Sequence, residues 1–273
     1  MAELGFTQTE AGAAGYLPDD PTELAGVLDG FGLKLLGGFV PLVLHKPEER
    51  EATIKAAHET AAMFRDAGAT YFVTAAVTTW DWAPRETLTE DEWQHLYEML
   101  DLVEDLVADY GLVQAVHPHI QTVIEQADEV QRVLDNSRAG WTYDTGHLLI
   151  GGYDPIEFGR NYTDRIRHVH LKDVVLSLSE PVMAGEQSIM EGVQAGMFCN
   201  LGAGDVPIDQ AVDIMVQSGF DGWYVIEQDA AIEGDIPAPG LGPVVDVAAS
   251  VNYLKSLATR DAHVRVNNNE GNS

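Results

Sequence analysis

The chain has 273 residues, of which 44 are acidic and 15 are basic, and its formal net charge at pH 7 is −29. This charge repels phosphate backbones, so it argues against nucleic acid as a partner and disfavours a nuclease. No apolar run has the length of a transmembrane helix, residues 1–20 lack the features of a signal peptide, and the single cysteine, Cys199, permits no internal disulfide, so we expect a cytoplasmic protein that does not enter a membrane.

Strands and helices alternate along the first half of the chain. Residues 3–6 predict the end of a short strand that begins almost at the first residue and carries Glu3. The elements expected after it are a helix over 21–31 with Asp20 as its N-cap, a strand within 33–44, a helix over 47–67, a strand over 71–77 and a helix over 90–110. Thr89 and Glu92 give the last of these helices a capping box.

The alternation continues through the second half. The expected elements are a strand over 112–119, a helix over 126–136, a strand over 140–143, a helix over 154–162, a strand over 165–173, a helix over 207–218, a strand over 222–229 and a helix over 244–259. Residues 174–205 predict a long irregular insert, which is typical of a functional lid. We expect one domain over residues 1–260 and a disordered tail over residues 261–273.

The order of these elements predicts the fold class. Strict alternation of strands and helices indicates a parallel sheet, and a long unbroken series favours a closed barrel over an open sheet. The count of seven pairs is one short of eight. We therefore predict an α/β fold, a (β/α)₈ TIM barrel that lacks its first β/α unit.

Polar side chains end several of the predicted strands. In a parallel barrel these positions converge even when they are far apart in sequence. The candidates are Glu3, His117, His119, Asp144, His147, His168, His170, Lys172 and Glu227. Because side chains alternate between the faces of a strand, His168, His170 and Lys172 are expected on one face. A single histidine on a strand more often packs in a core, but this set of His, Asp and Glu is typical of Mn²⁺, Fe²⁺, Co²⁺ or Zn²⁺ sites.

Several sequence blocks carry a family resemblance. YDTGH (143–147), HVHLKD (168–173) and WYVIEQD (223–229) occur in this order at barrel spacing. With them the chain resembles the xylose-isomerase-like superfamily of sugar isomerases and epimerases. GFVPLVLH (38–45) and FCNLGAGD (198–205) make it most similar, within that superfamily, to the inosose dehydratases of inositol catabolism.

The resemblance implies a divalent metal ion, most often Mn²⁺ or Co²⁺. It assigns the ion to Asp144, His170 and Glu227. The isomerases of the superfamily carry a glutamate on the strand where this chain has His117. His117 is therefore expected as the fourth ligand, with His119 or water as the alternatives.

The resemblance also implies a reaction, the dehydration of 2-keto-myo-inositol, which is a cyclic keto-polyol. An α-proton would be removed first and a β-hydroxide would leave afterwards. Lys172 is the expected base, because a cation nearby and a buried setting can lower the pKa of a lysine. His147 or His119 would protonate the departing hydroxide, and Glu3 would orient substrate hydroxyls.

Three readings stay open on the sequence alone. The chain is a lyase of this kind, a sugar isomerase or epimerase on the same scaffold, or an inactive barrel that binds a ligand. No nucleotide-binding motif is present in the sequence, so a redox cofactor is not expected. The sequence leaves the oligomeric state open, a homo-oligomer included.

Overall fold

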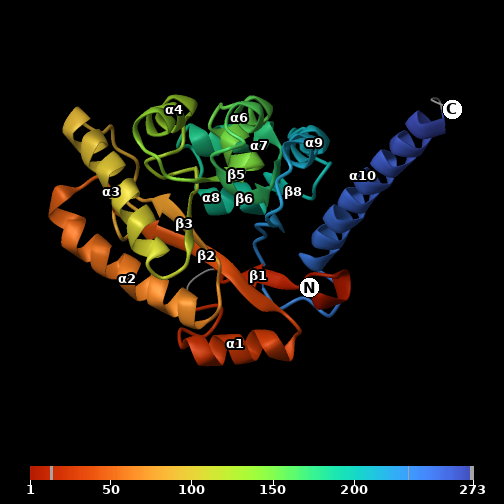
Figure 1. The fold of residues 1–273 in the computed structure, drawn as a ribbon, viewed down its shortest axis with the longest axis horizontal. Helices are drawn as coiled ribbons and strands as arrows, with labels where there is room; N and C mark the ends of the chain where they lie inside the picture. Colours follow the sequence, from red (N-terminus) through yellow and green to blue (C-terminus); the bar gives the residue numbers. More distant parts are fainter. Residues whose placement is uncertain (13–14, 233, 271–273) are drawn as a thin grey trace. The chain divides into compact units, whose positions relative to one another are not determined.

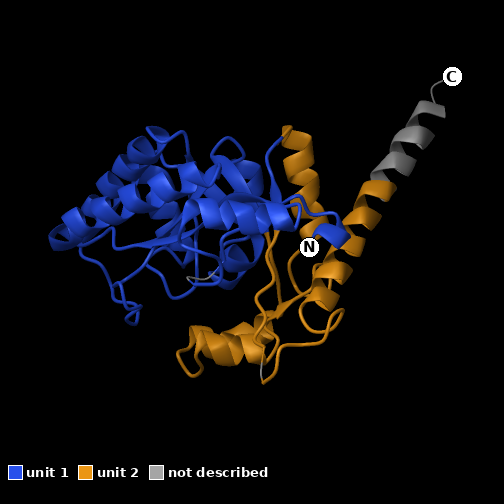
Figure 2. Ribbon diagram, turned by 90° about the horizontal axis from the view of Figure 1, so that it is seen from below, with its two compact units in different colours: residues 1–170, 221–225 blue, residues 171–220, 226–273 orange. Residues whose placement is uncertain are grey.

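The computed structural model describes residues 1–12, 15–232 and 234–270. This part of the chain divides into two compact units, which Figure 2 distinguishes by colour. The first unit comprises Met1–His170 and Asp221–Val225, and the second comprises Leu171–Phe220 and Ile226–Ser273. The expectation of a single domain over residues 1–260 stays a prediction.

Seven parallel strands form a nearly closed barrel in the order β1-β2-β3-β4-β5-β6-β9 (Figure 1). The strands are β1 (Gln8–Glu10), β2 (Lys34–Leu42), β3 (Tyr71–Ala76), β4 (Val113–Val116), β5 (Trp141–Asp144), β6 (Ile166–Leu171) and β9 (Tyr224–Ile226). The α/β barrel expected from the sequence is therefore confirmed. Within the described residues its sheet holds seven strands, as the count of strand–helix pairs predicted.

Helices connect these strands, and Figure 1 shows them outside the sheet. Those of the first unit are α1 (Pro21–Gly30), α2 (Arg50–Asp66), α3 (Glu90–Ala108), α4 (Ala127–Asn136), α5 (Thr145–Ile150) and α6 (Pro155–Asn161), with 3₁₀-helices η1 (Ala2–Leu4) and η2 (Pro47–Glu49). Helix α3 buries Trp93, Leu96, Leu100 and Val103, whose spacing places one face of the helix against the sheet. Its predicted capping box is present.

Apolar side chains fill the space between the strands of the first unit. Leu36, Tyr71 and Val73 form a buried cluster, and Val113 and Val225 pack against it. Strand β2 approaches β3 closely at Gly37, where any Cβ atom would collide with the carbonyl oxygen of Tyr71. The packed core holds the strands in register, which fixes the positions of the residues at their carboxyl ends.

The first strand differs from the sequence prediction. Residues 2–4 form η1 instead of a strand, and Gly5 ends that helix with a φ of 96°. The strand follows at Gln8–Glu10 and pairs with β2. A strand of three residues is too short to show the alternation by which strands are recognised, and this explains the misplacement.

The second unit contains the predicted insert, which is not irregular. Its elements are β7 (Asp173–Val174), α7 (Leu176–Met183), α8 (Ile189–Gln194) and β8 (Phe198–Cys199), followed by α9 (Ile208–Ser218) and α10 (Val244–Glu270). Strands β7 and β8 pair antiparallel. Elements this short carry too few residues for a periodic signal, so the sequence did not indicate them. A role of the insert as a lid stays a prediction.

One carboxylate organises the end of this insert. Asp173 is fully buried. Its side chain accepts hydrogen bonds from the backbone N–H groups of Gly202, Gly204 and Val206 at 2.8, 3.0 and 3.1 Å. It also accepts one from the N–H of Val174 at 2.9 Å. Four donors that point at one carboxylate hold the loop in a defined conformation.

The chain's last helix is longer than expected. Helix α10 continues to Glu270, whereas the sequence predicted disorder from residue 261 onwards. Residues 271–273 of that predicted tail lie outside the described residues. Among the helices that the structure describes, none is long and apolar enough to cross a membrane.

Candidate metal centre

Three predicted metal ligands lie at the carboxyl ends of three adjacent strands. His117 directly follows β4, Asp144 ends β5 and His170 lies near the end of β6. In the ladder between β5 and β6, Asp144 is the partner of His170. The exposed fractions of His117, Asp144 and His170 are 0%, 0% and 2%. Neighbouring strands thus bring together side chains that are far apart in sequence.

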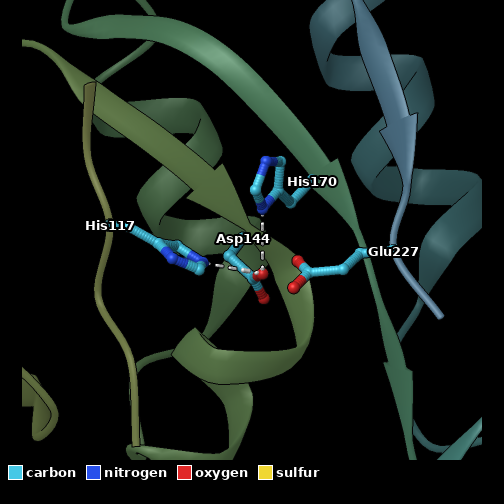
Figure 3. Close-up of side chains that lie close together, drawn as sticks. All are labelled: His117, Asp144, His170 and Glu227. Atoms are coloured by element: carbon cyan, nitrogen blue, oxygen red, sulfur yellow. Dashed lines mark hydrogen bonds and ion pairs between the residues drawn. The ribbon is translucent and has the colours of Figure 1, made fainter. Parts of the chain in front are cut away.

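Both imidazole rings face the same carboxylate oxygen (Figure 3). Nε2 of His117 lies 3.1 Å from Oδ2 of Asp144, and Nδ1 of His170 lies 3.7 Å from the same atom. Two ligands of one ion, each about 2.1 Å from it at tetrahedral angles, are roughly 3.4 Å apart. The observed separations therefore suit donors that share an ion, and the donor set of two nitrogens and one oxygen suits a divalent transition metal.

The carboxylate of Asp144 is fixed by its second oxygen. Oδ1 accepts a hydrogen bond from the backbone N–H of His147 at 2.7 Å, and Asp144 thereby caps helix α5. This cap leaves Oδ2 directed at the two imidazoles.

A second group of buried polar side chains adjoins the first. Oε1 of Glu10 lies 2.6 Å from Nε2 of His168 and 3.0 Å from Nε2 of His170. The side chains of His168 and His170 therefore lie on one face of β6, as the alternation predicted. Glu10 ends β1, so it occupies the strand-end position that the sequence prediction gave to Glu3.

Electrostatics keep Glu10 ionised. Burial would raise the pKa of Glu10, but the attraction of His170 and hydrogen bonds from both histidines hold that pKa well below its usual range. Burial is also the main influence on His168 and lowers its pKa, so this ring is neutral at pH 7. The ring of His168 stacks on that of Tyr71, with centroids 4.4 Å apart. Sequence reasoning missed Glu10 because its strand had been placed at residues 3–6.

The two predicted proton donors lie side by side. The rings of His119 and His147 have centroids 4.1 Å apart, and each lies 5.4 Å from the ring of His117. Trp82 and Phe39 stack on each other, and both contact the ring of His119. Trp82 has a φ of 59°, which is strained for a bulky residue. His119 and His147 thus join the group around His117.

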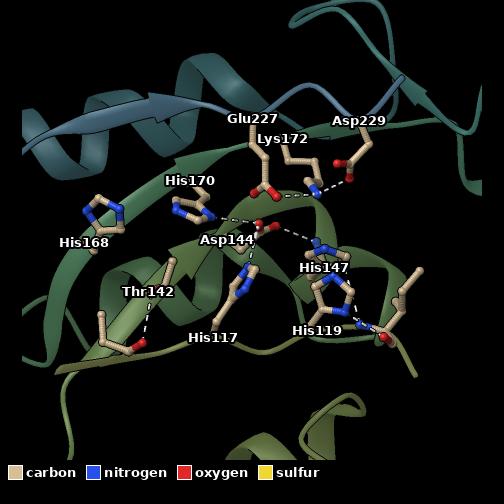
Figure 4. A network of polar contacts seen from close by, with 12 residues as sticks. His117, His119, Thr142, Asp144, His147, His168, His170, Lys172, Glu227 and Asp229 are labelled. Atoms are coloured by element: carbon tan, nitrogen blue, oxygen red, sulfur yellow. Dashed lines mark hydrogen bonds and ion pairs between the residues drawn. The ribbon is translucent and has the colours of Figure 1, made fainter. Parts of the chain in front are cut away.

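Lys172 and Glu227 belong to the second unit. Lys172 is fully buried, and Figure 4 shows its amine between two carboxylates. Nζ lies 2.9 Å from Glu227 and 2.7 Å from Asp229. It also lies over the ring of Phe198, 4.4 Å from the centroid. These partners favour the charged amine. Asp229 was not among the predicted site residues, although it lies two positions after Glu227 and would share one face of the predicted strand with it.

Glu3 lies away from any strand end. It is exposed on η1, so the reasoning that placed it at the end of the first strand was wrong. Its role in orienting a substrate stays a prediction.

Comparisons with known proteins agree with this architecture. A family described as "Xylose isomerase-like TIM barrel" matches residues 1–257. The inosose dehydratase of Geobacillus kaustophilus (strain HTA426) is 31% identical over 246 residues, which cover 85% of this chain and 79% of that protein. The rhizopine catabolism protein MocC of Rhizobium meliloti is 29% identical over 238 residues, or 84% of this chain and 72% of that protein.

Solved structures share the fold at lower identity. An L-ribulose 3-epimerase superposes with a TM-score of 0.69 at 14% identity and covers 96% of this chain and 89% of its own. The IOLI protein with a bound zinc atom superposes with a TM-score of 0.67 at 15% identity, and the match covers 93% of this chain and 87% of that protein. At such identities these likenesses show the fold alone.

Proposed function

The chain belongs to the xylose isomerase-like TIM barrel family, and we propose that it is an inosose dehydratase of inositol catabolism that uses a divalent metal ion. Its class as a dehydratase rests on the curated relatives that bear this name. The observation that carries the metal-dependent part is the buried group formed by His117, Asp144 and His170. The proposed substrate is 2-keto-myo-inositol.

The proposed ligands are the three side chains of that group together with Glu227. Glu227 directly follows β9, and the family resemblance assigns a metal-binding carboxylate to this position. We propose Mn²⁺ or Co²⁺ as the ion, with Zn²⁺ as the alternative, because the same donors also suit zinc. When bound, the ion would polarise the substrate ketone as a Lewis acid and make its α-hydrogen more acidic.

The proposed proton transfers use residues of the chain. Lys172 is the proposed base for the α-proton, and it must lose its own proton first because Glu227 and Asp229 favour the charged amine. His119 or His147 is proposed to protonate the hydroxide that leaves from the neighbouring carbon. Both rings lie beside His117, which supports a role close to the proposed ion.

The experiment combines metal analysis with a dehydration assay. We expect the purified protein to hold a divalent ion and to convert 2-keto-myo-inositol to its dehydration product. Asp144→Ala and His170→Ala should lose the ion and the activity together. His58→Ala is the control, since His58 is an exposed histidine of α2.

Two outcomes would contradict the proposal. Full metal occupancy in both Asp144→Ala and His170→Ala would show that these two residues do not bind the ion. Epimerisation of ketoses by the parent, without loss of water from the inosose, would place the chain among the isomerases of the superfamily.

A further inference from the structure

Glu10 is a largely buried carboxylate that takes no part in the proposed reaction. Its side chain is only 16% exposed, and it lies within the first unit against His168 and His170. His170 is one of the proposed metal ligands. It contacts Asp144 through Nδ1 and Glu10 through Nε2, so its two ring nitrogens face two different carboxylates.

The separations around Glu10 identify hydrogen bonds instead of a second ion site. Two ligands about 2.1 Å from one ion would be roughly 3.0 Å apart even at a right angle between them. The 2.6 Å between Glu10 and His168 is shorter than this and suits a hydrogen bond to a carboxylate. The 3.0 Å to His170 suits a hydrogen bond to the same oxygen.

This pairing decides which nitrogen of His170 carries the proton. An ionised carboxylate only accepts hydrogen bonds, so the Nε2 atoms of His168 and His170 must be the donors. A neutral imidazole protonated at Nε2 has its lone pair on Nδ1. Nδ1 of His170 is the atom that faces Asp144. Metal-binding histidines commonly donate their other N–H to a carboxylate, which orients the ring and strengthens its basicity.

We propose that Glu10 is a positioning residue that holds His170 in the Nε2-protonated tautomer and thereby directs Nδ1 at the metal ion. The hydrogen bond of His168 to the same oxygen fixes the carboxylate, and the stacking of His168 on Tyr71 fixes His168 in turn. The inference rests on the proposed function, because it presupposes that His170 binds a metal ion.

The experiment measures tautomers and zinc affinity in the full chain, with ¹⁵N-labelled histidine and Zn²⁺ as the probe. In the parent, the spectra of both the metal-free and the zinc-loaded protein should show His170 protonated at Nε2. Glu10→Ala should lose this preference and bind zinc about 10- to 100-fold more weakly. Glu10→Gln keeps one acceptor oxygen, so it should lose less affinity than Glu10→Ala.

Glu59→Gln is the matched control, because Glu59 is an exposed carboxylate of α2 whose partner is Lys55 on the same helix. It should leave both the tautomer and the affinity unchanged. Thermal unfolding of each variant identifies any that fails to fold. A folded Glu10→Ala with the parent's tautomer and zinc affinity would overturn this inference alone. A parent that binds no divalent ion would contradict the proposed function as well.

Discussion

At the scale of single residues, Lys172 offers the sharpest test of the proposed chemistry. Its amine is buried between Glu227 and Asp229, so it is either the base or a fixed partner of these carboxylates. We expect Lys172→Met to keep its metal ion and to lose about 100-fold or more of its α-hydrogen exchange and dehydration rates. Exchange of the substrate hydrogen with solvent, followed by NMR, measures the first step.

The control for this variant is Lys55→Met, since Lys55 is an exposed lysine of α2. A metal-loaded Lys172→Met enzyme that exchanges and dehydrates at the parent's rate would rule out Lys172 as the base. Its stability should be measured too, because the change leaves two carboxylates without their cation.

His45 predicts a dependence of stability on pH. The ring is fully buried, and its Nε2 lies 3.7 Å from Oε1 of Glu86, beyond hydrogen-bond distance. Burial, followed by the charge of Lys46, lowers the pKa of His45, while Glu86 and Glu92 oppose this effect. As the pH falls through about 6.5, this histidine takes up a proton in the unfolded chain, whereas in the folded chain it stays neutral to a lower pH. Stability contributed by the neutral ring is present above that pH and is lost as the pH falls.

Replacing this ring should flatten the pH profile. We expect the free energy of unfolding of His45→Leu, measured with urea at pH 7.5 and 5.5, to fall less on acidification than that of the parent. The difference should be at most about 1.4 kcal/mol per pH unit, the value for one proton. His58→Leu is the exposed control. If the free energy of unfolding fell equally with pH in the parent and in His45→Leu, His45 would not contribute to the pH dependence of stability.

At the scale of elements, Asp173 stabilises the segment before α9. It accepts four backbone N–H hydrogen bonds, three of them from the loop between β8 and α9. We expect Asp173→Asn to lower the free energy of unfolding by about 3 kcal/mol, because hydrogen bonds to a buried charge are lost and an amide cannot accept all four. Urea unfolding measures the change.

Asp235→Asn serves as the control for Asp173, since Asp235 is exposed in a loop. Limited proteolysis should cleave the loop around Gly202 and Gly204 faster in Asp173→Asn than in the parent. Unchanged stability together with unchanged cleavage would contradict the role given to this carboxylate.

At the scale of the whole molecule, the net charge of −29 predicts a dependence on salt. Repulsion between like charges destabilises the compact state, and salt screens it over about 10 Å at 0.1 M. We expect the thermal midpoint to rise between 0.02 M and 0.3 M NaCl, measured by calorimetry without added divalent ions. A midpoint that stays constant or falls would show that this repulsion does not limit stability.

The sequence by itself determined the barrel and the residue types that gather at its strand ends. Alternating strands and helices, the cap at Asp20 and the capping box at Thr89 are local signals that the structure confirms. The blocks around Asp144 and His170 identified the family, and the matches to curated relatives agree. His117, Asp144 and His170 come together because parallel strands bring their carboxyl ends to one edge, a rule that needs no knowledge of side-chain packing.

Tertiary structure alone decided the partners of these residues. Glu10 contacts His168 across 158 positions of sequence, and Asp229 contacts Lys172 across 57. No local pattern encodes such pairs, and the strand that carries Glu10 has only three residues. Residue types at strand ends predict what a site can bind. Which nitrogen of His170 faces Asp144, and which carboxylate contacts the other nitrogen, depends on packing between strands that are distant along the chain.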